Sequence, residues 1–219
     1  MKALLIGATG ATGSDLLQEL LVDKDFTCVE IFVRKVPEIN HPKLVVNVVN
    51  FERPEEWKEK IKGDVAFSAL GTTLKDAQSK EAQYRVDYTY QLRFAQAAKE
   101  NSVTKFVLVS SYGANSKSKL FYSRMKGELE EAVRALHFET TIIFQPGMLE
   151  RKNSTRTGEV LGARVIRFAN SLGILQSQRP LPTKVLAKAM SNASKIKSSG
   201  YSTIPLTSIW SFASKKTES

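Results

Sequence analysis

Short apolar runs alternate with longer amphipathic stretches along the first two thirds of the chain. The apolar runs are rich in Val, Ile and Leu, which is typical of strands, and they lie at residues 2–7, 29–33, 44–49, 64–70, 105–109 and 140–144. Apolar residues at helical spacing predict helices at residues 13–22, 55–61, 80–101 and 120–136. Because the strands are almost continuously apolar, we expect a parallel sheet covered by helices on both faces.

The pattern loosens after the Gln-Pro-Gly sequence at residues 145–147. Beyond it, we expect a polar loop at residues 150–159 and helices at 160–172 and 185–193. A short strand at 201–204 and a frayed tail at 215–219 should follow. A chain of 219 residues fits one α/β domain. We therefore expect a single domain over residues 1–219, with its core at 1–147 and a small substrate-side segment at 148–214.

A glycine-rich turn, GATGATG, joins the first strand to the first helix at residues 7–13. This order is typical of a dinucleotide site. Gly7 allows a tight turn, Gly10 leaves room for a pyrophosphate, and Gly13 lets the helix pack on the sheet. The N–H groups of the helix then face the phosphates. We expect a doubly wound Rossmann-type sheet that binds its cofactor through Gly7, Thr9, Gly10, Ala11, Thr12 and Gly13; a glycine-rich turn without a ligand is the alternative.

The residues after the second strand bear on the choice of cofactor. An acidic residue there accepts hydrogen bonds from the ribose of NAD, whereas an arginine pairs with the 2′-phosphate of NADP. Arg34 and Lys35 occupy this place. We therefore expect NADP(H) to be favoured over NAD(H), the alternative being that Arg34 is a solvated loop charge.

A Tyr-x-x-x-Lys pair, Tyr122 and Lys126, follows the fifth strand on a predicted helix. Residues four apart lie on one helical face, so the ammonium can stabilise a phenolate and the tyrosine can exchange a proton with a substrate oxygen. Ser110 and Ser111 end the fifth strand, at the carboxyl edge where ligands bind. A hydroxyl at this edge can hold a substrate carbonyl.

With these motifs in this order, the chain resembles the atypical or extended short-chain dehydrogenases/reductases. Within them it is similar to the small oxidoreductase group that includes the Tat-interacting protein and its fungal mitochondrial relatives. The similarity covers about residues 1–160 and rests on the glycine motif, residues 69–73 (ALGTT), Arg85-Val86-Asp87, Val109-Ser110-Ser111-x-Gly113-Ala114, Tyr122-x-x-x-Lys126-Gly127-Glu128 and Pro146-Gly147.

The resemblance implies a role for each matching residue. Tyr122 would be the acid/base, Lys126 its partner and a ribose ligand, and Ser111 the hydroxyl that orients the substrate. Ser110 stays an alternative to Ser111 because the spacing to Tyr122 is unusually short. Further cofactor contacts would come from Ala69, Leu70, Gly71 and Pro146.

Two positions depart from the wider family pattern. Asp87 stands where many extended members have an asparagine, and a carboxylate cannot donate as an amide does. Gln145 stands where an arginine commonly precedes Pro-Gly, which removes a cation that could meet an anionic substrate. Arg151 and Arg156 in the following loop are other candidates for that charge.

Charge and cysteine content exclude several classes of protein. The net charge is +10, but the basic residues are scattered, which favours a basic solvated surface over a nucleic-acid interface. No apolar run approaches the roughly 20 residues of a membrane span. The two histidines and the single Cys28 lack metal-ligand spacing, so no metal is expected. Lone Cys28 and the absence of a leader sequence lead us to expect a cytoplasmic protein.

The leading hypothesis is an NADP(H)-dependent oxidoreductase that acts on a small-molecule carbonyl or alcohol. A nucleotide-sugar epimerase is an alternative, although the chain after Pro146 is short for a roomy substrate domain. An NADP(H)-binding regulatory protein with little turnover is another. Related folds pair through their long helices, so a homodimer stays open, as does the identity of the substrate.

Overall fold

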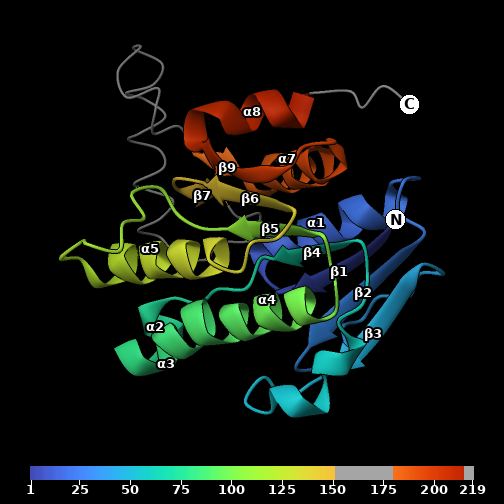
Figure 1. Ribbon diagram of the computed structural model, residues 1–219, viewed down its shortest axis with the longest axis horizontal. Coiled ribbons are helices and arrows are strands. Elements are labelled where there is room, and N and C mark those ends of the chain that lie inside the picture. The colour runs from blue at the N-terminus through green and yellow to red at the C-terminus, as the bar shows by residue number, and fades with distance from the viewer. Residues whose placement is uncertain (151–179, 215–219) are drawn as a thin grey trace.

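A parallel sheet forms the centre of the molecule in the computed structural model, which describes residues 1–150 and 180–214 (Figure 1). Within this part of the chain the main sheet has seven strands in the order β3-β2-β1-β4-β5-β6-β9. Their bounds are Lys2–Ile6 (β1), Cys28–Val33 (β2), Leu44–Val48 (β3), Val65–Ser68 (β4), Lys105–Val109 (β5), Thr140–Gln145 (β6) and Gly200–Pro205 (β9). Every neighbouring pair is parallel, which confirms the predicted α/β Rossmann-type fold.

Helices cover both faces of this sheet (Figure 1). One face carries α1 (Ala11–Val22), α7 (Thr183–Lys195) and α8 (Leu206–Ser214). The other carries α4 (Tyr90–Glu100) and α5 (Phe121–Arg134). Successive side chains of β1 point to opposite faces of the sheet. Leu5 packs on the face covered by α1, α7 and α8, and Leu4 packs on the face covered by α4 and α5. This period of two is why the strands are apolar throughout.

The direction of the strand order reverses at β1. The chain runs outward from β1 to β2 and β3, then returns to place β4 on the other side of β1. The turns after β1 and β4 therefore open side by side at the carboxyl edge of the sheet. This reversal is the place where open α/β sheets bind their ligands.

Several elements differ from the sequence expectation. The helix expected over residues 80–101 is divided into α3 (Lys80–Tyr84), a π-helical turn (Arg85–Thr89) and α4. The helix expected over 55–61 is a pair of 3₁₀ turns, Pro54–Glu56 and Lys58–Lys60. A short helix, α2 (Leu74–Ala77), was not expected. Short helices of this kind are set by local caps, here the Thr73 side chain, rather than by an apolar period.

The segment assigned to the substrate side belongs in large part to the main sheet and its helical layer. β9 pairs with β6, α7 packs against α1, and α8, which was not expected, packs on α7. A separate two-stranded pair joins β7 (Leu149–Glu150) and β8 (Leu181–Pro182). The expected helix over 160–172, the tail at 215–219, Arg151 and Arg156 lie outside the described residues.

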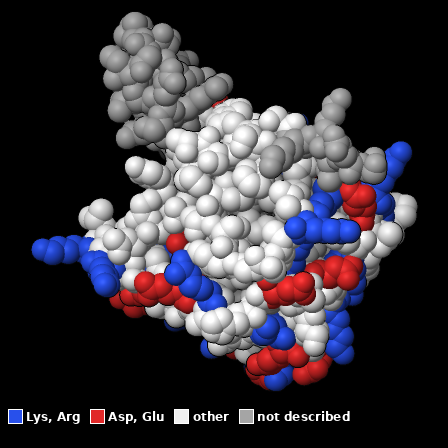
Figure 2. Space-filling model, turned by 45° about the horizontal axis from the view of Figure 1, so that its top comes forward, with Lys and Arg blue, Asp and Glu red and all other residues white. Residues whose placement is uncertain are grey.

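Charged side chains of both signs lie close together on the face drawn in Figure 2, along its lower and right-hand parts, with a wide area without charged side chains above them. This face therefore carries mixed charge, not one continuous basic patch. Among the described helices, none is long and apolar enough to cross a membrane.

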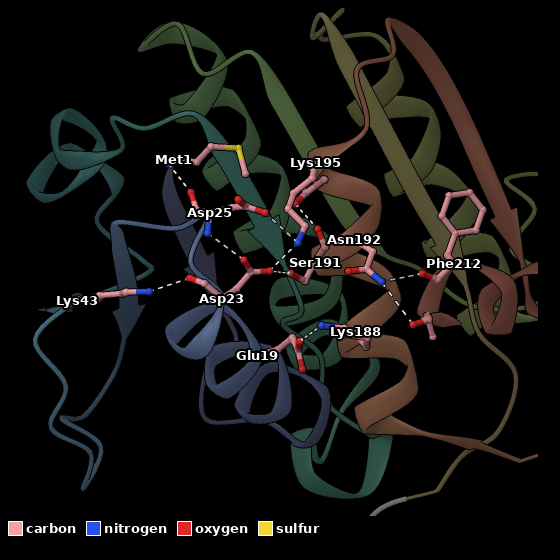
Figure 3. A network of polar contacts seen from close by, with 12 residues as sticks. Met1, Glu19, Asp23, Asp25, Lys43, Lys188, Ser191, Asn192, Lys195 and Phe212 are labelled. Atoms are coloured by element: carbon pink, nitrogen blue, oxygen red, sulfur yellow. Dashed lines mark hydrogen bonds and ion pairs between the residues drawn. The ribbon is translucent and has the colours of Figure 1, made fainter. Parts of the chain in front are cut away.

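A polar network joins α7 to α1 and to the turn that follows α1 (Figure 3). The Lys195 ammonium contacts the Asp23 carboxylate at 2.7 Å and the Asp25 carboxylate at 3.2 Å. One face of α7 also presents Lys188, whose ammonium pairs with the Glu19 carboxylate on α1. Residues more than 160 positions apart are thus joined, and the C-terminal elements are integral to the fold.

Candidate functional site

The glycine turn has little space for side chains at two of its three glycines. Gly7 has a φ of +82°, and a Cβ there would lie 2.4 Å from the carbonyl carbon of Ala69. A Cβ on Gly13 would lie 1.9 Å from the carbonyl oxygen of Gly7. Among the described residues, a Cβ on Gly10 would meet only that same oxygen, at 3.3 Å. Within this part of the chain the turn is therefore closely packed at Gly7 and Gly13 and less crowded at Gly10.

The start of α1 suits an anion. Gly10 is its N-cap and provides no capping side chain, and the first turn contains no acidic residue. The positive end of the helix dipole is thus left for an external negative charge. Together with the space that the described residues leave at Gly10, this end of the helix could accept an anion such as a phosphate.

Arg34 and Lys35 stand at the same edge. Both follow β2 directly and are exposed. Because β1 and β2 are parallel, with Ile6 opposite Phe32, the two cations lie on the glycine-turn side of the sheet. Within the described ranges, neither forms an ion pair with a carboxylate, so both are available to a phosphate.

The turn after β4 approaches the glycine turn from the other side. The Ala69 N–H donates to the Ile6 carbonyl at 3.1 Å, which fixes this turn beside Gly7. Leu70 and Gly71 follow at the carboxyl edge. The cofactor contacts expected at residues 69–71 therefore lie beside the phosphate end of the site, and they stay predictions.

Tyr122 and Lys126 lie one above the other on α5. Tyr122 is 41% exposed, whereas the Lys126 side chain is only 3% exposed. The Lys126 ammonium lies 6.0 Å from the centre of the Tyr122 ring and contacts the Asp87 carboxylate at 3.2 Å. A buried cation therefore lies near the ring of an accessible phenol.

A buried hydrogen-bond chain leads from the sheet to Lys126, and the sequence analysis missed most of it. The Ser68 hydroxyl donates to the Gln91 side chain at 2.7 Å, and Gln91 donates to the Asp87 main-chain carbonyl at 2.7 Å. The Thr72 N–H donates to the Asp87 carboxylate at 2.9 Å. The sequence signal for this chain is weak: Ser68 ends an apolar strand, and Gln91 lies four residues after Asp87.

Ser110 and Ser111 differ in burial. Ser110 is 5% exposed, and its hydroxyl has no hydrogen-bond partner among the described residues. Ser111 is half-buried, and its hydroxyl makes a long 3.4 Å contact with the Tyr112 carbonyl. Either hydroxyl could hold a substrate oxygen, so the choice between them stays a prediction.

The loop between Ser111 and Tyr122 packs closely on α5. The Asn115 N–H donates to the Ser123 carbonyl at 3.0 Å. A Cβ on Gly127 would lie 2.1 Å from the backbone nitrogen of Ser116. The Ser123 hydroxyl also donates to the Gly113 carbonyl, so the loop runs against the first turns of α5.

Gln145 and Pro146 lie at the end of β6. The Gln145 amide nitrogen donates to both carboxylate oxygens of Glu130 on α5, at 3.0 and 3.1 Å. Gln145 is thus engaged with a neighbouring helix. Pro146 is buried, and its carbonyl accepts the Tyr112 N–H at 2.8 Å, which joins this turn to the loop after β5.

Comparison with known proteins identifies relatives for most of the chain. The model of a family described as NAD(P)H-binding matches residues 7–168. The chain is 35% identical to the protein fmp52, mitochondrial, of Emericella nidulans, over 79% of this chain and 76% of that protein. It is 37% identical to FMP52, mitochondrial, of Saccharomyces cerevisiae, over 79% of this chain and 80% of that protein. The expected resemblance to this group is confirmed.

Solved structures share the fold at low sequence identity. UDP-glucose 4-epimerase of Thermotoga maritima, solved with UDP-glucose, matches with a TM-score of 0.70 at 12% identity. The match covers 96% of this chain and 81% of the epimerase chain. A short chain dehydrogenase family protein from Francisella tularensis has a TM-score of 0.65 at 14% identity, covering 94% of this chain and 97% of its own. At these identities the likeness concerns the fold alone.

The expected cytoplasmic location is wrong. Five of the relatives, at 33–40% identity, are named mitochondrial proteins, which points to mitochondria instead of the cytoplasm. The expectation rested largely on one unpaired cysteine. A single cysteine does not distinguish the two compartments, because it shows only that no disulfide forms within the chain.

Proposed function

Because the chain belongs to the NAD(P)H-binding family, we propose that it is an NADP(H)-dependent oxidoreductase acting on a carbonyl or alcohol group. The observation that carries the proposal is the buried Lys126 ammonium beneath the accessible Tyr122 phenol. This pair stands on α5, which follows the strand next to β4, and β4 ends beside the glycine turn. A nucleotide-binding turn and a proton-exchanging pair at one edge of a sheet suit hydride chemistry.

Particular residues would hold the cofactor. The glycine turn and the start of α1 would bind the pyrophosphate, and Arg34 with Lys35 would bind the 2′-phosphate of NADP(H). Residues 69–71 and Pro146 would line the remaining length of the dinucleotide, with Lys126 at the nicotinamide ribose. When bound, the nicotinamide supplies or accepts the hydride.

The chain's own residues would manage the proton. Tyr122 donates its phenol proton to the substrate oxygen during reduction and takes a proton back during oxidation. The Lys126 ammonium stabilises the phenolate left behind. Ser111, with Ser110 as the alternative, donates a hydrogen bond that holds the substrate oxygen beside Tyr122.

The surroundings of Gln145 support this proposal over a nucleotide-sugar epimerase. A diphosphate-linked sugar needs cations near its phosphates. Gln145 is neutral and donates to Glu130, so among the described residues the end of β6 presents an amide and a carboxylate at this position. This part of the site suits an uncharged carbonyl or alcohol.

The proposal is tested with the variant Tyr122→Phe, which removes the phenol oxygen and keeps the ring. We expect turnover of NADPH with a reactive aldehyde or ketone to fall about 10²–10⁴-fold, because one acid/base group is lost. The matched control is Tyr201→Phe, at a tyrosine on β9 whose hydroxyl contacts Thr203. The control should retain wild-type turnover; full turnover by Tyr122→Phe would contradict the mechanism.

A further inference from the structure

The Asp87 carboxylate forms a buried ion pair with the Lys126 ammonium, and the proposed function gives this contact no role. The carboxylate is 2% exposed and lies 3.2 Å from the ammonium, which is itself 3% exposed. An unpaired charge in the interior is costly, and here the two opposite charges lie in direct contact. Among the described residues, Asp87 is the carboxylate within ion-pair distance of Lys126.

Hydrogen bonds that do not involve α5 also fix the position of Asp87. One oxygen faces Lys126 and the other accepts the Thr72 N–H at 2.9 Å. The Asp87 backbone lies in the π-helical turn, and its carbonyl accepts a hydrogen bond from Gln91, which is bonded to Ser68 at the end of β4. Asp87 is therefore fixed relative to the sheet independently of α5.

Neighbouring carboxylates on α5 are engaged elsewhere. Glu130, one turn after Lys126, accepts both hydrogen bonds from Gln145. Glu128 accepts the Tyr84 hydroxyl at 3.0 Å and lies 3.9 Å from the Arg124 guanidinium. The charge balance at the Lys126 ammonium thus rests on Asp87.

We propose that Asp87 is a positioning residue that fixes the Lys126 ammonium for cofactor binding, an inference that rests on the proposed function for the role of Lys126. An ammonium has three N–H donors. Asp87 engages one and holds the nitrogen beneath Tyr122, which leaves two for the nicotinamide ribose and the phenol. The Asp87 carboxylate gives the ammonium a direct, charge-assisted contact.

The test is a double-mutant cycle with Asp87→Asn and Lys126→Met, read as the dissociation constant for NADPH by fluorescence titration, with NADH in parallel. Asp87→Asn keeps the side-chain shape and removes the charge. Alone, it should weaken NADPH binding about tenfold, the scale of one hydrogen bond to a charged group. In the Lys126→Met background it should change the affinity by less than about twofold, because the group it positions is gone.

A control separates positioning from general damage. Glu59→Gln makes the same carboxylate-to-amide change at an exposed site and should leave NADPH affinity unchanged. If Asp87→Asn fails to fold, Gln91→Met, which removes the hydrogen bond to the Asp87 carbonyl, takes its place in the same cycle. An equal loss in both backgrounds, or no loss from the single variant, would overturn the proposal.

This experiment distinguishes failure of the inference from failure of the proposed function. The cycle needs no substrate, so a coupled loss of affinity supports Asp87 positioning even if the protein turns over no carbonyl compound. Full turnover by Tyr122→Phe would contradict the proposed mechanism without altering the coupling measured between Asp87 and Lys126. Absence of binding of both dinucleotides by the wild-type protein would overturn the inference together with the cofactor site.

Discussion

At the scale of single residues, Gly127 sets how closely the loop after β5 approaches α5. Its Cα faces the backbone of Asn115 and Ser116, where a Cβ would lie 2.1–2.6 Å from main-chain atoms. The loop has no flexible side chain at this contact that could move aside. Gly127 therefore allows the loop that follows the serine pair to pack directly on the helix that carries Tyr122.

The variant Gly127→Ala tests this contact. In a helix interior, Gly→Ala alone would stabilise by about 1 kcal/mol. Here the added methyl displaces backbone, so we expect a net loss of about 1–3 kcal/mol in the free energy of unfolding. Turnover should fall with it, because the loop carrying Ser111 shifts. Urea denaturation with a parallel NADPH assay provides the measurement; a stability equal to or above wild type would refute the close approach.

Local order in the sequence was sufficient to predict the place of some residues in the fold and not of others. Gly7, Gly10 and Gly13 were assigned their geometry from a strand, a turn and a helix in succession. The spacing of Tyr122 and Lys126 likewise placed both on one helical face. Asp87 could not be paired with Lys126 in the same way, because the contact joins separate helices through tertiary packing.

At the scale of elements, the π-helical turn could not be predicted from the spacing of apolar residues. The sequence predicted one helix over residues 80–101, because its apolar positions fit a 3.6-residue period. The extra residue in a π turn shifts the register of hydrogen bonds, and such turns are frequent at functional sites. Here the turn contains Asp87, whose carbonyl bonds Gln91 one turn further along. An apolar pattern carries no signal for this polar arrangement.

The contact between α1 and α7 makes a pH-dependent contribution to stability. Burial raises the pKa of Asp23, but hydrogen bonds from Lys195 and from the Asp25 N–H outweigh it, and the pKa lies below its ordinary 3.8. Burial lowers the pKa of Lys195, but its bonds to Asp23 and Asp25 outweigh this, and the pKa lies above its ordinary 10.5. The Asp23 contribution is present above about pH 4 and lost as the pH falls further. The Lys195 contribution is present below about pH 10.5 and lost as the pH rises further.

Lys195→Met, which keeps the aliphatic stem, should therefore destabilise the protein most at intermediate pH. We expect a loss of about 1.5–3 kcal/mol near neutrality, the scale of a hydrogen bond to a charged group. The difference from wild type should shrink below about pH 4 and above about pH 10.5. Denaturant unfolding across this range measures it. A difference that does not vary with pH would show that the loss comes from packing rather than from charge.

At the scale of the whole molecule, the alternation of strands and helices predicted the Rossmann-type sheet through β6. The C-terminal part was harder to place. β9 is an edge strand with Ile204 as its buried residue, so its alternation is faint. α8 has no charged residue and thus no polar face to reveal a helical period. Their packing on β6 and α7 arises from tertiary contacts.

We propose above that the glycine turn and the cations after β2 together form an NADP(H) site. Direct titration of the wild-type protein and of Arg34→Ala with NADPH and NADH tests it without a known substrate. We predict that the wild-type protein binds NADPH at least tenfold more tightly than NADH, since a charge-assisted pair with the 2′-phosphate is worth about 1.5–3 kcal/mol. Arg34→Ala should lose most of that difference while keeping its affinity for NADH. Equal affinities of the wild-type protein for the two dinucleotides would contradict the claim.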